Sequence, residues 1–162
     1  MKNCSLILLI TYLFFLSSCE CDGRILLPDL TADIEAAGVL RLNQPFQVKV
    51  HVINEKEDSR CDNDVHQPVT AESLTAVAIT YRPAGTAEWA PYEFGTTAGR
   101  TQRLLLDTPP PADCPGDEHE SVVSAAITLY DAGEYRFEVT ADYGNDVEER
   151  DESNNAFQKT LN

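Results

Sequence analysis

The stretch DAGEYRFEVTADY, residues 131–143, decides the fold class of this chain. Apolar side chains occupy every second position from Tyr135 to Tyr143, and polar side chains occupy the positions between them. This period of two is typical of a β-strand with one face buried and the other in water. The stretch therefore predicts an amphipathic strand near the C-terminus.

The same alternation recurs along the rest of the chain. It marks further candidate strands at residues 28–35, 46–54 and 74–82; residues 89–94, 103–106 and 155–161 are further candidates, and 122–129 is strand-like but mostly apolar on both faces. No stretch beyond residue 18 has a sustained helical period. Seven or eight short strands in a chain of this length predict an all-β, antiparallel β-sandwich.

Gly133 and Tyr135 stand where the C-terminal strand begins. This arrangement resembles the tyrosine corner of immunoglobulin-like domains, in which the Tyr hydroxyl bonds to the backbone just upstream. It predicts that the Tyr135 hydroxyl holds the turn before its strand. The alternative is a core tyrosine that follows an ordinary turn.

Two motifs at opposite ends of residues 28–161 extend this resemblance. Pro28-Asp-Leu30 opens the domain, and the acidic stretch NDVEERDESNN, residues 145–155, precedes the last strand. Together they resemble CARDB, the cell-adhesion-related domain found in bacteria. The resemblance implies a non-catalytic, immunoglobulin-like module. The chain departs from the family's pattern in two long loops, 55–73 and 107–120, each of which holds a cysteine.

The N-terminus has the features of an export signal. Lys2 precedes an apolar run, and Leu16-Ser-Ser-Cys19 closes it, which resembles the lipobox of bacterial lipoproteins. The resemblance implies a signal peptide at 1–18, an acylated Cys19, a tether at 19–27 and a domain at 28–162. An ordinary signal peptide with an incidental cysteine stays open, as does an uncleaved membrane helix, although the run is shorter than the ~20 residues that span a bilayer.

An acylated Cys19 would place the protein in the bacterial cell envelope, held to a membrane by its lipid. The residues that follow it, Glu20 and Asp22, favour the outer membrane or cell surface over the inner membrane. The chain has 27 Asp and Glu against 12 Lys and Arg, a net charge of −15. Such a charge disfavours nucleic acid as a partner and favours cations.

Cys61 and Cys114 lie in the two long loops, which an immunoglobulin-like topology places at one end of the sandwich. In an exported protein these cysteines predict a disulfide bond. Each is followed five positions later by a histidine, His66 or His119, so a zinc site is an alternative, and free thiols are another.

The loop before the last strand adds acidic residues at the same end. Because calcium prefers hard oxygen ligands, the acidic side chains of these loops form a candidate calcium site. The candidate ligands are Asp62, Asp64, Asp146, Glu148, Glu149, Asp151 and Glu152. No EF-hand pattern is present, and a solvated acidic loop is the alternative reading. The topology places this end near the N-terminal anchor.

Trp89, Tyr92 and Phe94 form a candidate binding patch for a glycan or a protein, with core packing as the alternative. No nucleophile elbow, P-loop or zinc-protease motif is present. The sequence thus predicts a lipid-anchored, non-enzymatic binding or adhesion-related module of the bacterial envelope, without a cofactor other than the candidate calcium. Its partner would be an envelope protein or glycan. The alternatives are a structural subunit of a larger envelope complex and a metal-dependent enzyme.

Overall fold

The computed structural model describes residues 25–37, 40–55, 65–66, 69, 72–113 and 119–161. The predicted signal peptide, the lipidation site Cys19, both cysteines of the predicted disulfide (Cys61 and Cys114) and the candidate ligands Asp62 and Asp64 lie outside these residues.

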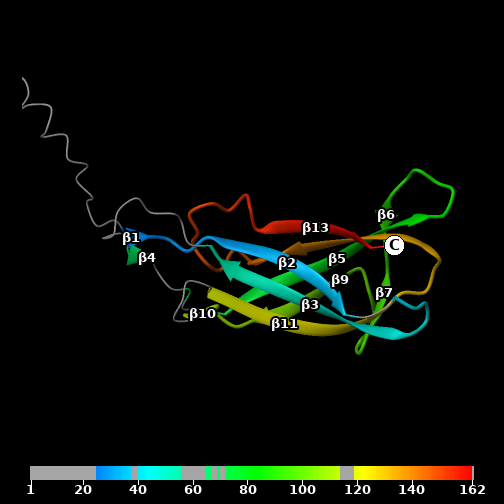
Figure 1. Ribbon diagram of the computed structural model, residues 1–162, viewed down its shortest axis with the longest axis horizontal. Helices are drawn as coiled ribbons and strands as arrows, with labels where there is room; N and C mark the ends of the chain where they lie inside the picture. The colour runs from blue at the N-terminus through cyan, green and yellow to red at the C-terminus, as the bar shows by residue number, and fades with distance from the viewer. Residues whose placement is uncertain are drawn as a thin grey trace, which may run out of the picture.

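Two antiparallel sheets face each other (Figure 1). The first has the order β2-β3-β11-β7-β8, with β10 paired to β11. Its strands are β2 (Leu30–Ala37), β3 (Pro45–Asn54), β7 (Phe94–Thr96), β8 (Gly99–Thr101), β10 (Ala112–Asp113) and β11 (His119–Thr128). The second has the order β13-β12-β5-β6, with β9 paired to β5. Its strands are β5 (Ser73–Pro83), β6 (Ala90–Pro91), β9 (Arg103–Thr108), β12 (Gly133–Thr140) and β13 (Ala156–Leu161). A parallel pair, β1 (Ile25–Leu26) and β4 (Val65–His66), lies outside both sheets.

The core fills the space between the two sheets. Burial alternates along β3, whose Val48, Val50 and Val52 are fully buried while their neighbours are not. Phe137 and Val139 of β12 are also fully buried and complete the core from the other sheet. Burying such side chains contributes roughly 1.5–3 kcal/mol each and is the main force that joins the sheets. The predicted fold class, an immunoglobulin-like antiparallel β-sandwich, is confirmed.

Tyr135 forms the predicted tyrosine corner. Its side chain is buried, and its hydroxyl donates a hydrogen bond to the backbone oxygen of Asp131 and accepts one from the Asp131 N–H at 3.3 Å. Two further tyrosines hold the same turn: Tyr81 donates to the Ala132 oxygen at 2.8 Å, and Tyr92 accepts from the Tyr130 N–H at 2.8 Å. Burial is the main reason why the pKa of the Tyr135 phenol lies well above its ordinary value.

Gly133 is needed where this turn enters β12. A Cβ atom there would lie 2.5 Å from the backbone oxygen of Arg82 and 2.5 Å from the ring of Tyr81. The glycine thus lets the strand approach β5 closely enough for the tyrosine corner to form.

Replacing Tyr135 with Phe should destabilise the domain by about 1–2 kcal/mol, because the backbone groups of Asp131 lose the hydroxyl that bonds to them. Tyr130→Phe is the matched control, since the Tyr130 hydroxyl makes no hydrogen bond within the described residues. Urea unfolding of both variants measures the difference. Equal effects of the two substitutions would contradict the role given to the Tyr135 hydroxyl.

The segment 89–94, predicted as one strand, is divided between the two sheets. β6 pairs with β5, whereas β7 pairs with β11 through Gly95 and Thr128. Between them the Tyr92 N–H donates to the Ile79 oxygen at 2.9 Å. The chain changes sheets here because Tyr92 and Phe94 both turn their rings into the core.

Candidate functional site

Residues 141–155, here called the acidic hairpin, lie at the end of the sandwich where the domain begins. β12 ends at Thr140, which pairs with Ala156 at the start of β13. At the same end, β2 begins at Leu30, opposite Asn54, the last residue of β3. Figure 1 shows the loop between β12 and β13 beside the start of β2. The predicted placement of the acidic residues at the N-terminal end of the domain therefore agrees with the topology.

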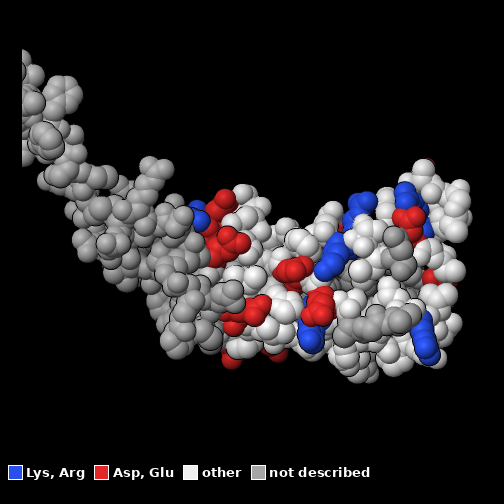
Figure 2. All heavy atoms as spheres, viewed as in Figure 1, with Lys and Arg blue, Asp and Glu red and all other residues white. Residues whose placement is uncertain are grey.

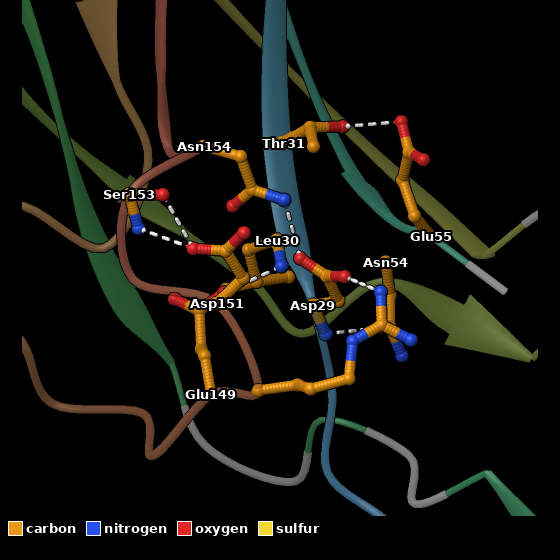
Figure 3. A network of polar contacts seen from close by, with 10 residues as sticks. Asp29, Leu30, Thr31, Asn54, Glu55, Glu149, Asp151, Ser153 and Asn154 are labelled. Atoms are coloured by element: carbon orange, nitrogen blue, oxygen red, sulfur yellow. Dashed lines mark hydrogen bonds and ion pairs between the residues drawn. The ribbon is translucent and has the colours of Figure 1, made fainter. Parts of the chain in front are cut away.

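Asp29 joins the first strand to the acidic hairpin (Figure 3). Its side chain is buried, accepts a hydrogen bond from Asn154 Nδ2 at 2.6 Å and forms an ion pair with Arg150. The Asp29 N–H donates to Asn54 Oδ1 at 2.9 Å, and the Arg150 N–H donates to the Pro28 oxygen at 2.9 Å. The two sequence motifs that resemble CARDB thus bind each other directly.

Glu149 makes the second connection between these segments. It is only 6% exposed; its carboxylate accepts hydrogen bonds from the Leu30 N–H at 2.5 Å and from Asn155 Nδ2 at 2.9 Å. Burial raises the pKa of this carboxyl to about 7, although both hydrogen bonds act in the opposite direction. Glu149 therefore changes its charge near neutral pH while it remains in contact with β2.

Other carboxylates fix the shape of the hairpin from within. Asp142, at a positive φ of 41°, accepts hydrogen bonds from the N–H groups of Asp146 at 3.0 Å and Val147 at 2.9 Å. Asp151 accepts from the Ser153 N–H at 2.9 Å and from its hydroxyl, and these bonds lower the pKa of Asp151. Short acidic side chains that bond to nearby backbone are typical of turns. Much of the hairpin's acidity is therefore structural.

Three carboxylates converge in the acidic hairpin. Oxygen atoms of Asp142, Glu149 and Glu152 all lie within 4.8 Å of one another, and the first two side chains are buried. Glu149 and Glu152 belong to the predicted calcium set, whereas Asp146, Glu148 and Asp151 are exposed and lie outside this cluster. Calcium takes 6–8 oxygen ligands, so the cluster supplies part of a shell.

Asp142 was not among the predicted ligands. The alternating pattern extended the strand to Tyr143 and placed Asp142 on its solvated face, but β12 ends at Thr140. The signal that could have identified it is the DYGN sequence of residues 142–145, which is rich in residues that favour turns.

The predicted aromatic patch is wrong for two of its three members. Phe94 is fully buried and Tyr92 is 7% exposed, so both rings complete the core and cannot form a contact surface. Trp89 is partly exposed, and the guanidinium groups of Arg82 and Arg136 lie 4.9 and 4.3 Å from its ring centre.

Comparison with known proteins agrees with the resemblance seen in the sequence. The CARDB family model matches residues 114–159, and the resemblance to that family is thereby confirmed. No curated protein matches the chain significantly. Within the described ranges, no helix is long and apolar enough to cross a membrane.

Two solved structures are similar to this chain, and both are of the CARDB domain of the PF1109 protein from Pyrococcus furiosus. A crystal structure of that domain in complex with di-metal ions has a TM-score of 0.45 and 20% identity, covering 83% of this chain and 92% of that one. A solution NMR structure has a TM-score of 0.45 and 22% identity, covering 84% and 94%.

Proposed function

We propose that this chain, whose residues 114–159 carry the CARDB pattern, is a lipid-anchored, non-enzymatic, adhesion-related binding module of the bacterial envelope. The lipid on Cys19 would hold the protein to a membrane, and an envelope protein or glycan would be its partner. The observation that carries this proposal is the N-terminal sequence Leu16-Ser-Ser-Cys19, which lies a few residues before the domain. A structural subunit of a larger envelope complex would need the same anchor.

The fold supports a binding role over catalysis. His51, the histidine whose side chain is described, lies on a strand surface with its Nδ1 2.6 Å from Glu120 and its Nε2 3.8 Å from Glu35. The buried carboxylates at the N-terminal end contact backbone and amide groups of the same chain. These contacts give the groups a structural role and leave the exposed surfaces for partners.

Replacing Cys19 with Ala should abolish lipid attachment. In bacteria fed an alkyne-labelled fatty acid, the wild type should carry the label and Cys19→Ala should carry none. Cys21→Ala is the matched control because it removes a thiol two residues away, and it should be labelled like the wild type. An unlabelled wild type, or a labelled Cys19→Ala, would contradict the proposed anchor.

A second candidate function is cation binding by Asp142, Glu149 and Glu152. The convergence of their oxygens favours it, as does the raised pKa of Glu149, which a cation would lower by stabilising the charged carboxylate. A cation there would stiffen the acidic hairpin where it contacts the first strand. The calcium response of Glu149→Gln, described with its pH dependence below, tests this candidate.

A further inference from the structure

A groove of about 510 Å³ lies on the outer face of the second sheet. It is lined by Ala78, Ile79, Thr80, Pro91, Thr101, Gln102, Arg103 and Glu138. The groove forms because β5 presents small side chains on this face, between the longer side chains of β9 and β12. In addition, β5 changes its strand partner at the groove. β9 pairs with β5 as far as Ala78, and β6 pairs with β5 from Thr80.

The polar groups of the groove have unused hydrogen-bonding capacity. The Thr80 hydroxyl oxygen is shielded from solvent and has no hydrogen-bond partner among the described residues, which is unusual for a buried polar atom. Glu138 accepts one long hydrogen bond, from Gln158 Nε2 at 3.3 Å, and Gln102 is exposed. The Thr80 hydroxyl, the Gln102 amide and the Glu138 carboxylate thus offer hydrogen-bond donors and acceptors on one concave surface. Such a set suits a ligand that carries several hydroxyl groups.

Two arginines beside the groove lack a carboxylate partner among the described residues. Arg103 donates to the hydroxyl of Tyr143, and Arg136 stacks on Trp89, whereas Arg82 forms an ion pair with Glu134. Figure 2 shows Lys and Arg gathered toward the end away from the acidic hairpin. In a chain with a net charge of −15, unpaired arginines beside a groove indicate that the ligand carries an anionic group.

Two partly exposed aromatic rings lie near the groove. Trp89 contacts Arg136, whose backbone partner Thr80 lines the groove, and Tyr143 contacts Arg103 in its wall. Tyr143 is 44% exposed. Flat rings of this kind offer an apolar surface to a ligand while their polar edges remain in water.

We propose that this groove binds an acidic glycan that carries uronate groups. Arg103 and Arg136 would bind the sugar carboxylates; Thr80, Gln102 and Glu138 would bind sugar hydroxyls; and Trp89 and Tyr143 would contact ring faces. This site deepens the proposed function, since it names the partner of the anchored module. The glycan would bind on a sheet face, and the acidic hairpin would remain on the side of the anchor.

Full-length protein in detergent should bind uronate oligosaccharides, measured by calorimetry and by amide shifts of Thr80, Arg103 and Glu138. The probes are tetramers of galacturonate and mannuronate and a hyaluronan tetramer. Methyl-esterified tetragalacturonate, which lacks the charge, should bind about 100-fold more weakly if each of the two charge-assisted contacts is worth about 1.4 kcal/mol.

Arg103→Gln and Arg136→Gln should each weaken binding about 10-fold, and Arg100→Gln should leave it within about 2-fold. Arg100 is the matched control for Arg103 because it also stacks on a tyrosine, Tyr130, but does not line the groove. Thr80→Val should weaken binding without lowering stability, because the hydroxyl has no partner in the part of the chain that the structure describes.

Failure of all three acidic oligosaccharides to bind at millimolar concentration would overturn the glycan site. So would binding that Arg103→Gln and Arg136→Gln leave unchanged. Neither result would bear on the proposed lipid anchor at Cys19, because the fatty-acid labelling experiment tests that anchor separately. Binding of a protein partner that competes for the groove, with no glycan bound, would also overturn the proposal.

Discussion

Asp29→Ala should destabilise the domain by about 3 kcal/mol at pH 7. The substitution removes a buried carboxylate together with its contacts to Arg150 and Asn154. Removing one member of a buried ion pair typically costs ~3–5 kcal/mol. The lower end applies here because the Arg150 side chain is 37% exposed and regains part of its hydration. Chemical denaturation with urea measures the effect.

Glu35→Ala is the matched control for this prediction. Glu35 lies on β2, the strand that Asp29 precedes, but its side chain is 55% exposed, and its nearest nitrogen atoms, Lys49 Nζ and His51 Nε2, are 3.8 Å away. Exposed ion pairs contribute roughly 0–1 kcal/mol, so the control should lose little stability. If Asp29→Ala costs no more than Glu35→Ala, the connection between β2 and the acidic hairpin does not stabilise the domain.

Glu149 should make the stability of the domain fall as pH rises from about 5 to 8. Its pKa is about 7 in the folded protein against an ordinary value of 4.5, so the folded state holds the proton more tightly than the unfolded state. Its contribution is fully present below pH 4.5 and is lost as pH rises through 7. The expected loss is on the order of 2–3 kcal/mol, from about 1.4 kcal/mol per pKa unit.

Glu149→Gln should remove this pH dependence and be more stable than the wild type at pH 8. Its side-chain oxygen can still accept from the Leu30 N–H, and once the Asn155 amide turns over, the new amide can donate to Asn155 Oδ1, which has no hydrogen-bond partner among the described residues of the wild type. Denaturation at several pH values measures the difference between the two proteins, so other titrating groups cancel. A difference that stays constant from pH 5 to 8 would contradict the shifted pKa.

Calcium tests whether the three converging carboxylates of the hairpin bind a cation or are only a structural feature of it. If Asp142, Glu149 and Glu152 bind calcium, millimolar calcium at pH 8 should stabilise the wild type and leave Glu149→Gln nearly unchanged. A wild type with no calcium response would reject the second candidate function and leave the cluster as a structural feature of the hairpin.

The strands were predictable because each has one buried face. Alternation located β3 to within one residue at its start, since Phe46, Val48, Val50 and Val52 must all face the core. Tyr135 was predictable because a tyrosine corner needs a glycine and a tyrosine at fixed positions before a strand. These features are local, and a sequence shows them directly.

The contacts of the acidic hairpin were not predictable in the same way. Asp29 and Arg150 are far apart in the chain, and no spacing rule places their side chains together. Glu149 and Glu148 are adjacent and chemically identical, yet one is buried and the other exposed. Burial of a charged residue depends on which loop covers it. The acidic composition of the hairpin therefore predicted a cation site. In the structure, its carboxylates mostly form hydrogen bonds to the backbone.

The aromatic patch was misassigned for a related reason. Tyr92 and Phe94 lie on a segment that passes from one sheet to the other. Where a strand changes sheets, its side chains no longer alternate between the core and the solvent. Trp89 remains outside because it stands before this change, where Arg82 and Arg136 cover its ring.

The central claim is that the acidic hairpin is a fixed part of the sandwich, bound to its first strand. Amide hydrogen exchange of the full chain tests it most directly. Three N–H groups form the relevant hydrogen bonds: Leu30 donates to Glu149, Val147 to Asp142, and Arg150 to Pro28. These three amides should exchange about 1000-fold more slowly than unprotected amides. Glu148, whose N–H makes no hydrogen bond within the described residues, should exchange fast. Exchange of all four amides within about 10-fold of the unprotected rate would contradict the claim.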